Sequence, residues 1–208
     1  MKKIILAALA AMSLMLSAPA ATAAPVSKEA LKTQIKSGRY AGLLERYKAG
    51  ESLTADEAAT VYYGSALQPG FNPAVEYTAM LAAYNQGDMA RAYRLCEEAL
   101  AGDPTNLTLL FKAFSSASAS VDPAIKAKAP VYQTRLLAIC DAIFNSGTGV
   151  ADNSPYMLIR PSDTDEFLVK YMQPAGILGR ARIGQTEAIK VRLDGVADDV
   201  ILYFSIFK

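Results

Sequence analysis

Tyr84–Asn106 reads YNQGDMARAYRLCEEALAGDPTN, and this stretch decides which fold the chain is expected to adopt. Gly87-Asp88 marks a turn before a helix, and Asp103-Pro104 marks the end of that helix. Between these signals, Ala92 and Ala99 are spaced so that both small side chains lie on one face of the helix. The stretch therefore predicts the second helix of a closely packed helical hairpin.

These spacings resemble the second half of a tetratricopeptide repeat, in which Gly-Asp, two alanines and Asp-Pro occupy fixed offsets. The expected first helix, NPAVEYTAMLAAYNQ at residues 72–86, departs from that pattern. Glu76 and Met80 stand where an aromatic residue and a glycine are usual. TNLTLLFKAF, at residues 105–114, is expected to begin another helix. A helical hairpin of no particular family gives a similar pattern, and this alternative stays open.

Helical signals extend over residues 27–146, where about seven helices are expected. Thr54 and Glu57 have the spacing of a capping box, in which each side chain accepts a hydrogen bond from a free amide. Asn72-Pro73 and Asp122-Pro123 each place a proline at the first position of an expected helix. Residues 24–146 are therefore expected to form a helical region.

Residues 147–208 are expected to form a β-rich region that packs on the helices. A loop rich in Gly, Ser and Asn precedes it, and SDTDEFLVKYM is expected to form a short helix capped by Ser162. The expected strands are YMLI, ILGRARI, EAIKVRL and VILYFSIF. Helices followed by strands indicate an α+β fold, with tetratricopeptide-like hairpins before a small antiparallel sheet.

The N-terminus, MKKIILAALAAMSLMLSAPAATAAP, has the pattern of a secretory signal peptide. Lys2 and Lys3 precede an apolar segment that is short for a membrane span. Small residues at 21–23 predict cleavage after Ala23, so residues 1–23 form the expected signal peptide. Cleavage lowers the 21 basic residues by two, to 19, against 20 acidic ones, and the net charge changes from +1 to −1. We expect a periplasmic or extracellular protein without membrane insertion or nucleic-acid binding.

A second resemblance covers nearly the whole chain after the signal peptide. It rests on five features in order: VYYG, the central hairpin, SGTG, DEF and ILYFSI. Together they resemble the exported bacterial family named domain of unknown function 4919. Thr148 stands where that family has Asp, and Phe167 where it has Tyr. The resemblance implies an exported protein of gut-type Bacteroidetes and brings no known activity.

The composition narrows the possible chemistry. The chain has no His and no Trp, and 52% of its residues are hydrophobic. Without His, the commonest general base and metal ligand is missing. We therefore expect no cofactor, no catalytic residues and no metal ligands of that kind.

Acidic residues and a glycine loop are the next candidates. Asp163, Asp165 and Glu166 could bind Ca²⁺ together with Asp198-Asp199, but the helix dipole already explains acids in a first helical turn. The same carboxylates could serve a hydrolase acting on glycans, although Trp platforms are absent. Ser146-Gly147-Thr148-Gly149 could cradle an anion, but a linker is the favoured interpretation because no Lys-Ser/Thr follows.

Two further features have structural interpretations. Cys96 and Cys140 could form a disulfide in an exported protein, but each lies on an apolar helix stripe, so buried thiols are favoured. In Tyr62-Tyr63-Gly64 we expect the glycine to end a helix and one tyrosine to pack inward. The other tyrosine could face a ligand.

The sequence leaves two classes of function. The first is an exported module that binds a protein or peptide in a groove between hairpins, with Tyr77, Tyr84, Asn85 and Lys112 in its wall. The second is a carboxylate-dependent hydrolase of cell-wall or glycan material. The absence of His, Trp and a nucleophile motif favours the first.

Overall fold

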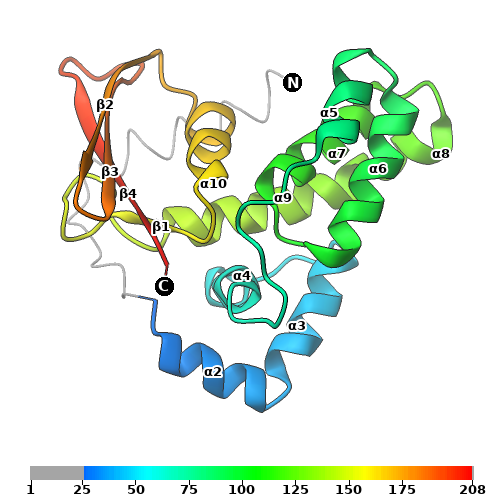
Figure 1. Ribbon diagram of the computed structural model, residues 1–208, viewed down its shortest axis with the longest axis horizontal. Helices are drawn as coiled ribbons and strands as arrows, with labels where there is room; N and C mark the ends of the chain where they lie inside the picture. The colour runs from blue at the N-terminus through cyan, green and yellow to red at the C-terminus, as the bar shows by residue number, and fades with distance from the viewer. Residues whose placement is uncertain (1–25, 208) are drawn as a thin grey trace. The chain divides into compact units, whose positions relative to one another are not determined.

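The computed structural model describes residues 26–207, and these residues adopt the predicted α+β fold. The chain divides into two compact units (Figure 1). We call residues 27–142 the helical unit and residues 143–207 the sheet unit. The predicted signal peptide and its cleavage site lie outside the described residues. The predicted packing of the β-rich region on the helices stays a prediction.

Three helices that pack against one another open the helical unit: α2 (Lys28–Lys36), α3 (Arg39–Lys48) and α4 (Ala55–Ser65). Ser27 caps α2 by accepting a hydrogen bond of 3.2 Å from the Ala30 amide. Thr54 and Glu57 form both hydrogen bonds of the predicted capping box at the start of α4. Local signals therefore fix where these two helices begin.

The role of Gly64 in α4 differs from the prediction. Tyr62 and Tyr63 are both completely buried, and α4 continues past Gly64 through Ser65. A Cβ atom at Gly64 would lie 2.7 Å from Cδ2 of Tyr40, closer than carbon atoms can approach. Gly64 is thus required by the close approach of the Tyr40 ring, and it does not end the helix.

The predicted hairpin is formed by the next helices, which pack in chain order (Figure 1): α5 (Thr78–Asn85), α6 (Met89–Gly102) and α7 (Leu107–Ala119). Asp88 caps α6 through the Arg91 amide at 3.1 Å, and Asn106 caps α7 in the same way. Ala92 and Cys96 of α6 are completely buried, as small residues at a helix crossing should be. The tetratricopeptide-like assignment of this hairpin stays an interpretation.

Helix α5 begins later than predicted. Asn72 does accept a hydrogen bond from the Ala74 amide at 3.0 Å, but this bond closes only an isolated turn. The helix starts at Thr78, after Tyr77 with φ −114° and ψ 52°. The extended residues before it let the Tyr77 hydroxyl reach Asp103, a tertiary contact that no local cap signal contains.

Two helices complete the helical part of the chain: α8 (Pro123–Lys126) and α9 (Ala129–Phe144). Asp122 caps α8 with Pro123 at its first position, as predicted. Helix α9 contributes the completely buried Ile139 and Cys140 to the core.

The sheet unit contains a four-stranded sheet in the order β1-β4-β3-β2. Its strands coincide with the four predicted segments: β1 (Tyr156–Leu158), β2 (Gly176–Ile183), β3 (Thr186–Arg192) and β4 (Val200–Ile206). The sheet is mixed, not antiparallel as predicted, because β1 pairs in parallel with β4. The long connection between β1 and β4 makes parallel pairing possible.

The short helix of the sheet unit also differs from the prediction. It consists of α10 (Ser162–Asp165) followed by the π-helix η1 (Glu166–Met172). Ser162 does not cap it, because Pro161 occupies the cap position with helical angles and no side chain accepts a capping hydrogen bond. The π-helix ends at Met172, and Gln173 directly after it has a φ of 51°.

Aromatic side chains form the core of the sheet unit. The ring of Phe167 from η1 lies 5.5 Å from that of Tyr156 and 6.4 Å from that of Phe204. Ile189 and Leu202 are buried beside them on neighbouring strands. The predicted strand alternation therefore places one face of the sheet against η1.

Within residues 26–207, no helix has the length and apolar character that crossing a membrane requires.

Candidate functional site

Side chains of α5 and α7 meet at what we call the α5–α7 seam, formed by Tyr84, Lys112 and Ser115. The Lys112 Nζ atom lies 3.8 Å from the centre of the Tyr84 ring, and the Tyr84 hydroxyl lies 2.8 Å from Ser115 Oγ. Tyr84 and Lys112 are half-buried, so each keeps part of its surface in solvent. The seam combines a cation, an aromatic ring and two hydroxyl groups.

The other two predicted groove residues take no part in this contact. Tyr77 donates a hydrogen bond of 3.2 Å to Asp103 at the end of α6, so its hydroxyl helps to hold the hairpin together. Asn85 is exposed in the last turn of α5. The structure thus brings Tyr84 and Lys112 together, and the groove itself stays a prediction.

A polar network between α6 and α9 was missed by the sequence analysis. Glu97 Oε1 accepts hydrogen bonds from the hydroxyls of Tyr93 at 2.5 Å and Tyr132 at 3.0 Å. Burial, followed by the bond to Glu97, raises the pKa of Tyr93, and burial raises the pKa of Tyr132 to about 12. Both phenols therefore remain protonated donors at neutral pH. The spacing of Tyr93 and Glu97 along one helix was visible in the sequence, but the partner on α9 was not.

Arg135 extends the same network. Its guanidinium donates a hydrogen bond of 3.0 Å to the Pro104 carbonyl and lies 5.0 Å from the centre of the Tyr47 ring. The Tyr47 hydroxyl donates to the same carbonyl at 3.2 Å. The buried Arg135 side chain thus holds the turn after α6 against α3 and α9, which is a structural task.

The Ser146–Gly149 loop uses its polar groups internally. The Ser146 hydroxyl accepts a hydrogen bond from the Met157 amide at 2.8 Å. The Thr148 amide donates to the Ser154 hydroxyl at 3.0 Å, and the Gly149 amide donates to the Ser154 carbonyl at 2.9 Å. These two amides point at the protein's own oxygen atoms, so the loop does not present them as an anion cradle.

The two acids of α10 are each paired with an arginine. Asp163 is completely buried and lies 3.7 Å from the guanidinium of the equally buried Arg160. Asp165 binds Arg180 of β2. Because each carboxylate faces a different arginine, the two do not converge on one point.

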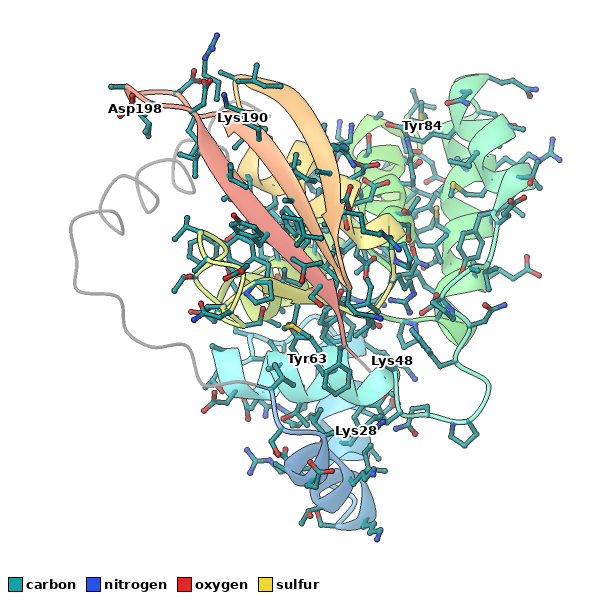
Figure 2. All side chains as sticks on the ribbon, turned by 60° about the vertical axis from the view of Figure 1, so that its left-hand side comes forward. Lys28, Lys48, Tyr63, Tyr84, Lys190 and Asp198 are labelled. Carbon is teal, nitrogen blue, oxygen red and sulfur yellow. The ribbon has the colours of Figure 1, made fainter. Side chains whose placement is uncertain are left out.

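The predicted acidic turn at Asp198-Asp199 also contains a carboxylate that pairs with basic side chains. Lys190 and Arg192 lie 3.2 and 3.1 Å from the Asp199 carboxylate. Desolvation alone would raise the pKa of Asp199, but these two bases outweigh it and hold that pKa below its usual value. Lys190 and Asp198 lie toward the same end of the sheet (Figure 2). No group of three His, Cys, Asp or Glu residues suited to a metal ion occurs within residues 26–207.

Cys96 and Cys140 are both buried thiols, as the sequence analysis favours, and no disulfide bond joins them. Burial raises the pKa of Cys96 to about 12, although the positive charge of Lys112 acts in the opposite direction. A thiol with so high a pKa stays protonated and is a poor nucleophile at neutral pH.

The family model described as Domain of unknown function (DUF4919) matches residues 27–206. The match covers most of the chain, and the chain therefore belongs to this family. No curated protein and no solved structure matches it. Two of the sequence features that carry the resemblance now have physical explanations, since Gly64 admits the Tyr40 ring and Gly149 admits the Tyr156 ring.

Proposed function

We propose that this chain is an exported protein, periplasmic or secreted, whose helical unit binds a peptide or a partner protein. The proposal of export rests on the N-terminal pattern of Lys2, Lys3, the apolar segment and the small residues before Ala24. The proposal of binding rests on the α5–α7 seam.

The seam supports binding for two reasons. Its side chains are partly exposed, so a partner can contact them, and they are held in fixed positions, so the contact can be specific. The Tyr84–Lys112 contact and the Tyr84–Ser115 hydrogen bond hold the two helices in one arrangement. A cation beside an aromatic ring suits a carboxylate, a backbone carbonyl or an apolar side chain of a peptide. Leu81 of α5, which is 37% exposed, adds apolar surface on the same helix.

Helix order gives further support. In tetratricopeptide arrays, the first helices of consecutive hairpins line the concave binding surface. Here α5 and α7 would be such first helices, with α6 between them in the chain. Three repeats are usually needed for a continuous core, and this chain has one clear hairpin. Helix α9 contacts α6 through Tyr132 and Glu97, and it thereby covers part of the surface that further repeats would bury.

The alternative, a carboxylate-dependent hydrolase, draws no support from the described residues. Hydrolysis of a glycoside needs two carboxylates on either side of one bond, and one of them needs a raised pKa. Asp163 and Asp165 are each paired with a different arginine, and the pKa of Asp199 is lowered.

Site-specific photo-crosslinking tests the binding proposal. A photoreactive amino acid would replace Asn85, which is exposed beside the seam, or Lys32, which is exposed on α2. We expect irradiation of native envelope material to give a discrete adduct from position 85 and none from position 32. Lys112→Glu should abolish that adduct because it reverses the charge of the seam. Identical adducts from both positions, or an adduct unaffected by Lys112→Glu, would contradict binding at the seam.

A further inference from the structure

The outer edge of β2 has no neighbouring strand among residues 26–207. β2 stands at one end of the strand order, so β3 occupies only its inner edge. Seven of its eight residues are exposed. Such an edge leaves backbone N–H and C=O groups directed outward, where an added strand can pair with them.

Large apolar side chains are exposed on the same strand. Ile177, Leu178 and Ile183 are 40%, 45% and 56% exposed. Soluble proteins usually shorten or cover an edge strand of this kind, because exposed apolar edges attract other strands. β2 is eight residues long, and these side chains keep about half of their surface exposed.

The pairing with β3 assigns the side chains of β2 to two faces. Arg180 lies opposite the buried Ile189, and Arg182 follows on the same face two residues later. Ala181 and Ile183 lie on the other face. The strand therefore presents arginines on one face and apolar side chains on the other.

The start of the strand is irregular. The register shifts between Ile177 and Gly179, which leaves Leu178 outside the regular pairing. A bulge of this kind bends a strand and interrupts its ladder. The regular part of the edge is accordingly limited to residues 179–183.

The two arginines differ in how many carboxylates contact them. Arg180 binds Asp165 and lies 3.2 Å from Glu187. Arg182 is exposed and makes no ion pair with any residue between 26 and 207. Glu187 stands opposite Arg182 in the strand register, but its carboxylate contacts Arg180. Arg182 is therefore the arginine of this edge that has no carboxylate within ion-pair distance among residues 26–207, whereas Arg180 is held by two.

This charge pattern disfavours a second copy of the chain as the neighbour. Two β2 strands paired edge to edge in antiparallel order would bring the arginines of both copies onto one face, where like charges repel. A negatively charged side chain on the arginine face of an added strand would instead pair with Arg182.

We propose that the outer edge of β2 binds an extended strand of a partner protein, with carboxylates at alternate positions and apolar residues between them. The backbone of the added strand pairs with β2, a carboxylate of that strand faces Arg182, and its apolar side chains cover Ala181 and Ile183. This surface is in the sheet unit, so it is independent of the proposed binding at the α5–α7 seam.

Binding of synthetic peptides to the unmutated protein tests the proposal. The probe is a short fluorescent peptide in which Glu and Val alternate, and its matched control has the same residues in two blocks. Both peptides have the same charge, but only the alternating peptide can place carboxylates on one face and valines on the other. We expect saturable binding of the alternating peptide by fluorescence anisotropy, and at least about tenfold weaker binding of the block peptide.

Variants and hydrogen exchange locate the contact. Arg182→Glu should weaken the alternating peptide at least about tenfold. Lys32→Glu, with the same change of charge on an exposed residue of the helical unit, should leave its affinity unchanged. Bound peptide should slow amide exchange within residues 179–183. Circular dichroism establishes that both variants are folded.

Three results would each overturn the proposal. They are equal binding of the alternating and block peptides, equal weakening by Arg182→Glu and Lys32→Glu, and bound peptide that leaves exchange at residues 179–183 unaltered. Absence of saturable binding at millimolar peptide would overturn it as well. None of these results bears on crosslinking at Asn85, so the two proposals fail separately.

Discussion

At the scale of single residues, Gly149 shows why the SGTG motif needs a glycine at its last position. Its φ is 69°, and a Cβ atom would lie 2.1 Å from Cε2 of the buried Tyr156. Its carbonyl also accepts a hydrogen bond of 2.7 Å from the Tyr203 amide on β4. One residue therefore needs both a left-handed backbone and no side chain, while it ties the loop to the sheet.

Gly149→Ala is accordingly expected to destabilise the protein by roughly 3 kcal/mol, from overpacking against Tyr156 together with the strained backbone. Gly195→Ala is the matched control, since Gly195 also has a positive φ, 78°, but nothing lies within 4 Å of its added Cβ. That substitution should cost only about 1 kcal/mol. Urea unfolding monitored by circular dichroism measures both. Equal losses of unfolding free energy in the two variants would show that the contact with Tyr156 is unimportant.

At the scale of single elements, the start of α4 depends on one carboxylate. Glu57 accepts a hydrogen bond of 2.9 Å from the Thr54 amide and one of 2.8 Å from Arg46. The bond from Thr54 and then the bond from Arg46 lower the pKa of Glu57. The folded state thus favours the ionised form more than the unfolded state does.

This lowered pKa predicts how the cap responds to acid. The contribution of the Glu57 charge is complete above the unfolded pKa and is lost as the pH falls through the lower folded pKa. Glu57→Gln should therefore be less stable than the wild type at neutral pH, and the difference should shrink below about pH 4. Glu51→Gln removes another partner of Arg46 without touching the cap, so it should show a smaller effect. Urea midpoints across pH provide the measurement, and a difference that stays constant with pH would contradict the mechanism.

Elements were predictable where the signal is local. Thr54, Asp88, Asn106 and Asp122 cap helices near the positions that their spacing indicates, because a cap bond spans only two or three residues. The alternating apolar residues similarly revealed all four strands.

Elements set by distant contacts were not predictable in this way. Helix α5 begins at Thr78 because Tyr77 reaches Asp103, and Gly64 meets a ring from another helix. The parallel pairing of β1 follows from its position beside β4, which no local pattern encodes. The network of Glu97 joins residues 35 positions apart, so only one of its two tyrosine bonds could be anticipated.

At the scale of the whole molecule, both units contribute surfaces with different chemistry. The helical unit presents a cation and an aromatic ring at the α5–α7 seam, whereas the sheet unit presents an edge strand with two arginines. The two proposals together describe a protein that connects partners. Both proposals depend on the proposed export, and the position of signal-peptide cleavage tests that step.

The mature chain is predicted to begin at Ala24. Protein isolated from the envelope or medium of its native host should lack the first 23 residues by intact-mass spectrometry, because Ala21-Thr22-Ala23 supplies small side chains where signal peptidase requires them. Ala23→Tyr should block cleavage and leave the precursor, whereas Ala20→Tyr, three residues earlier, should be processed normally. Recovery of the intact chain from the cytoplasm would contradict export, and normal processing of Ala23→Tyr would place the cut elsewhere.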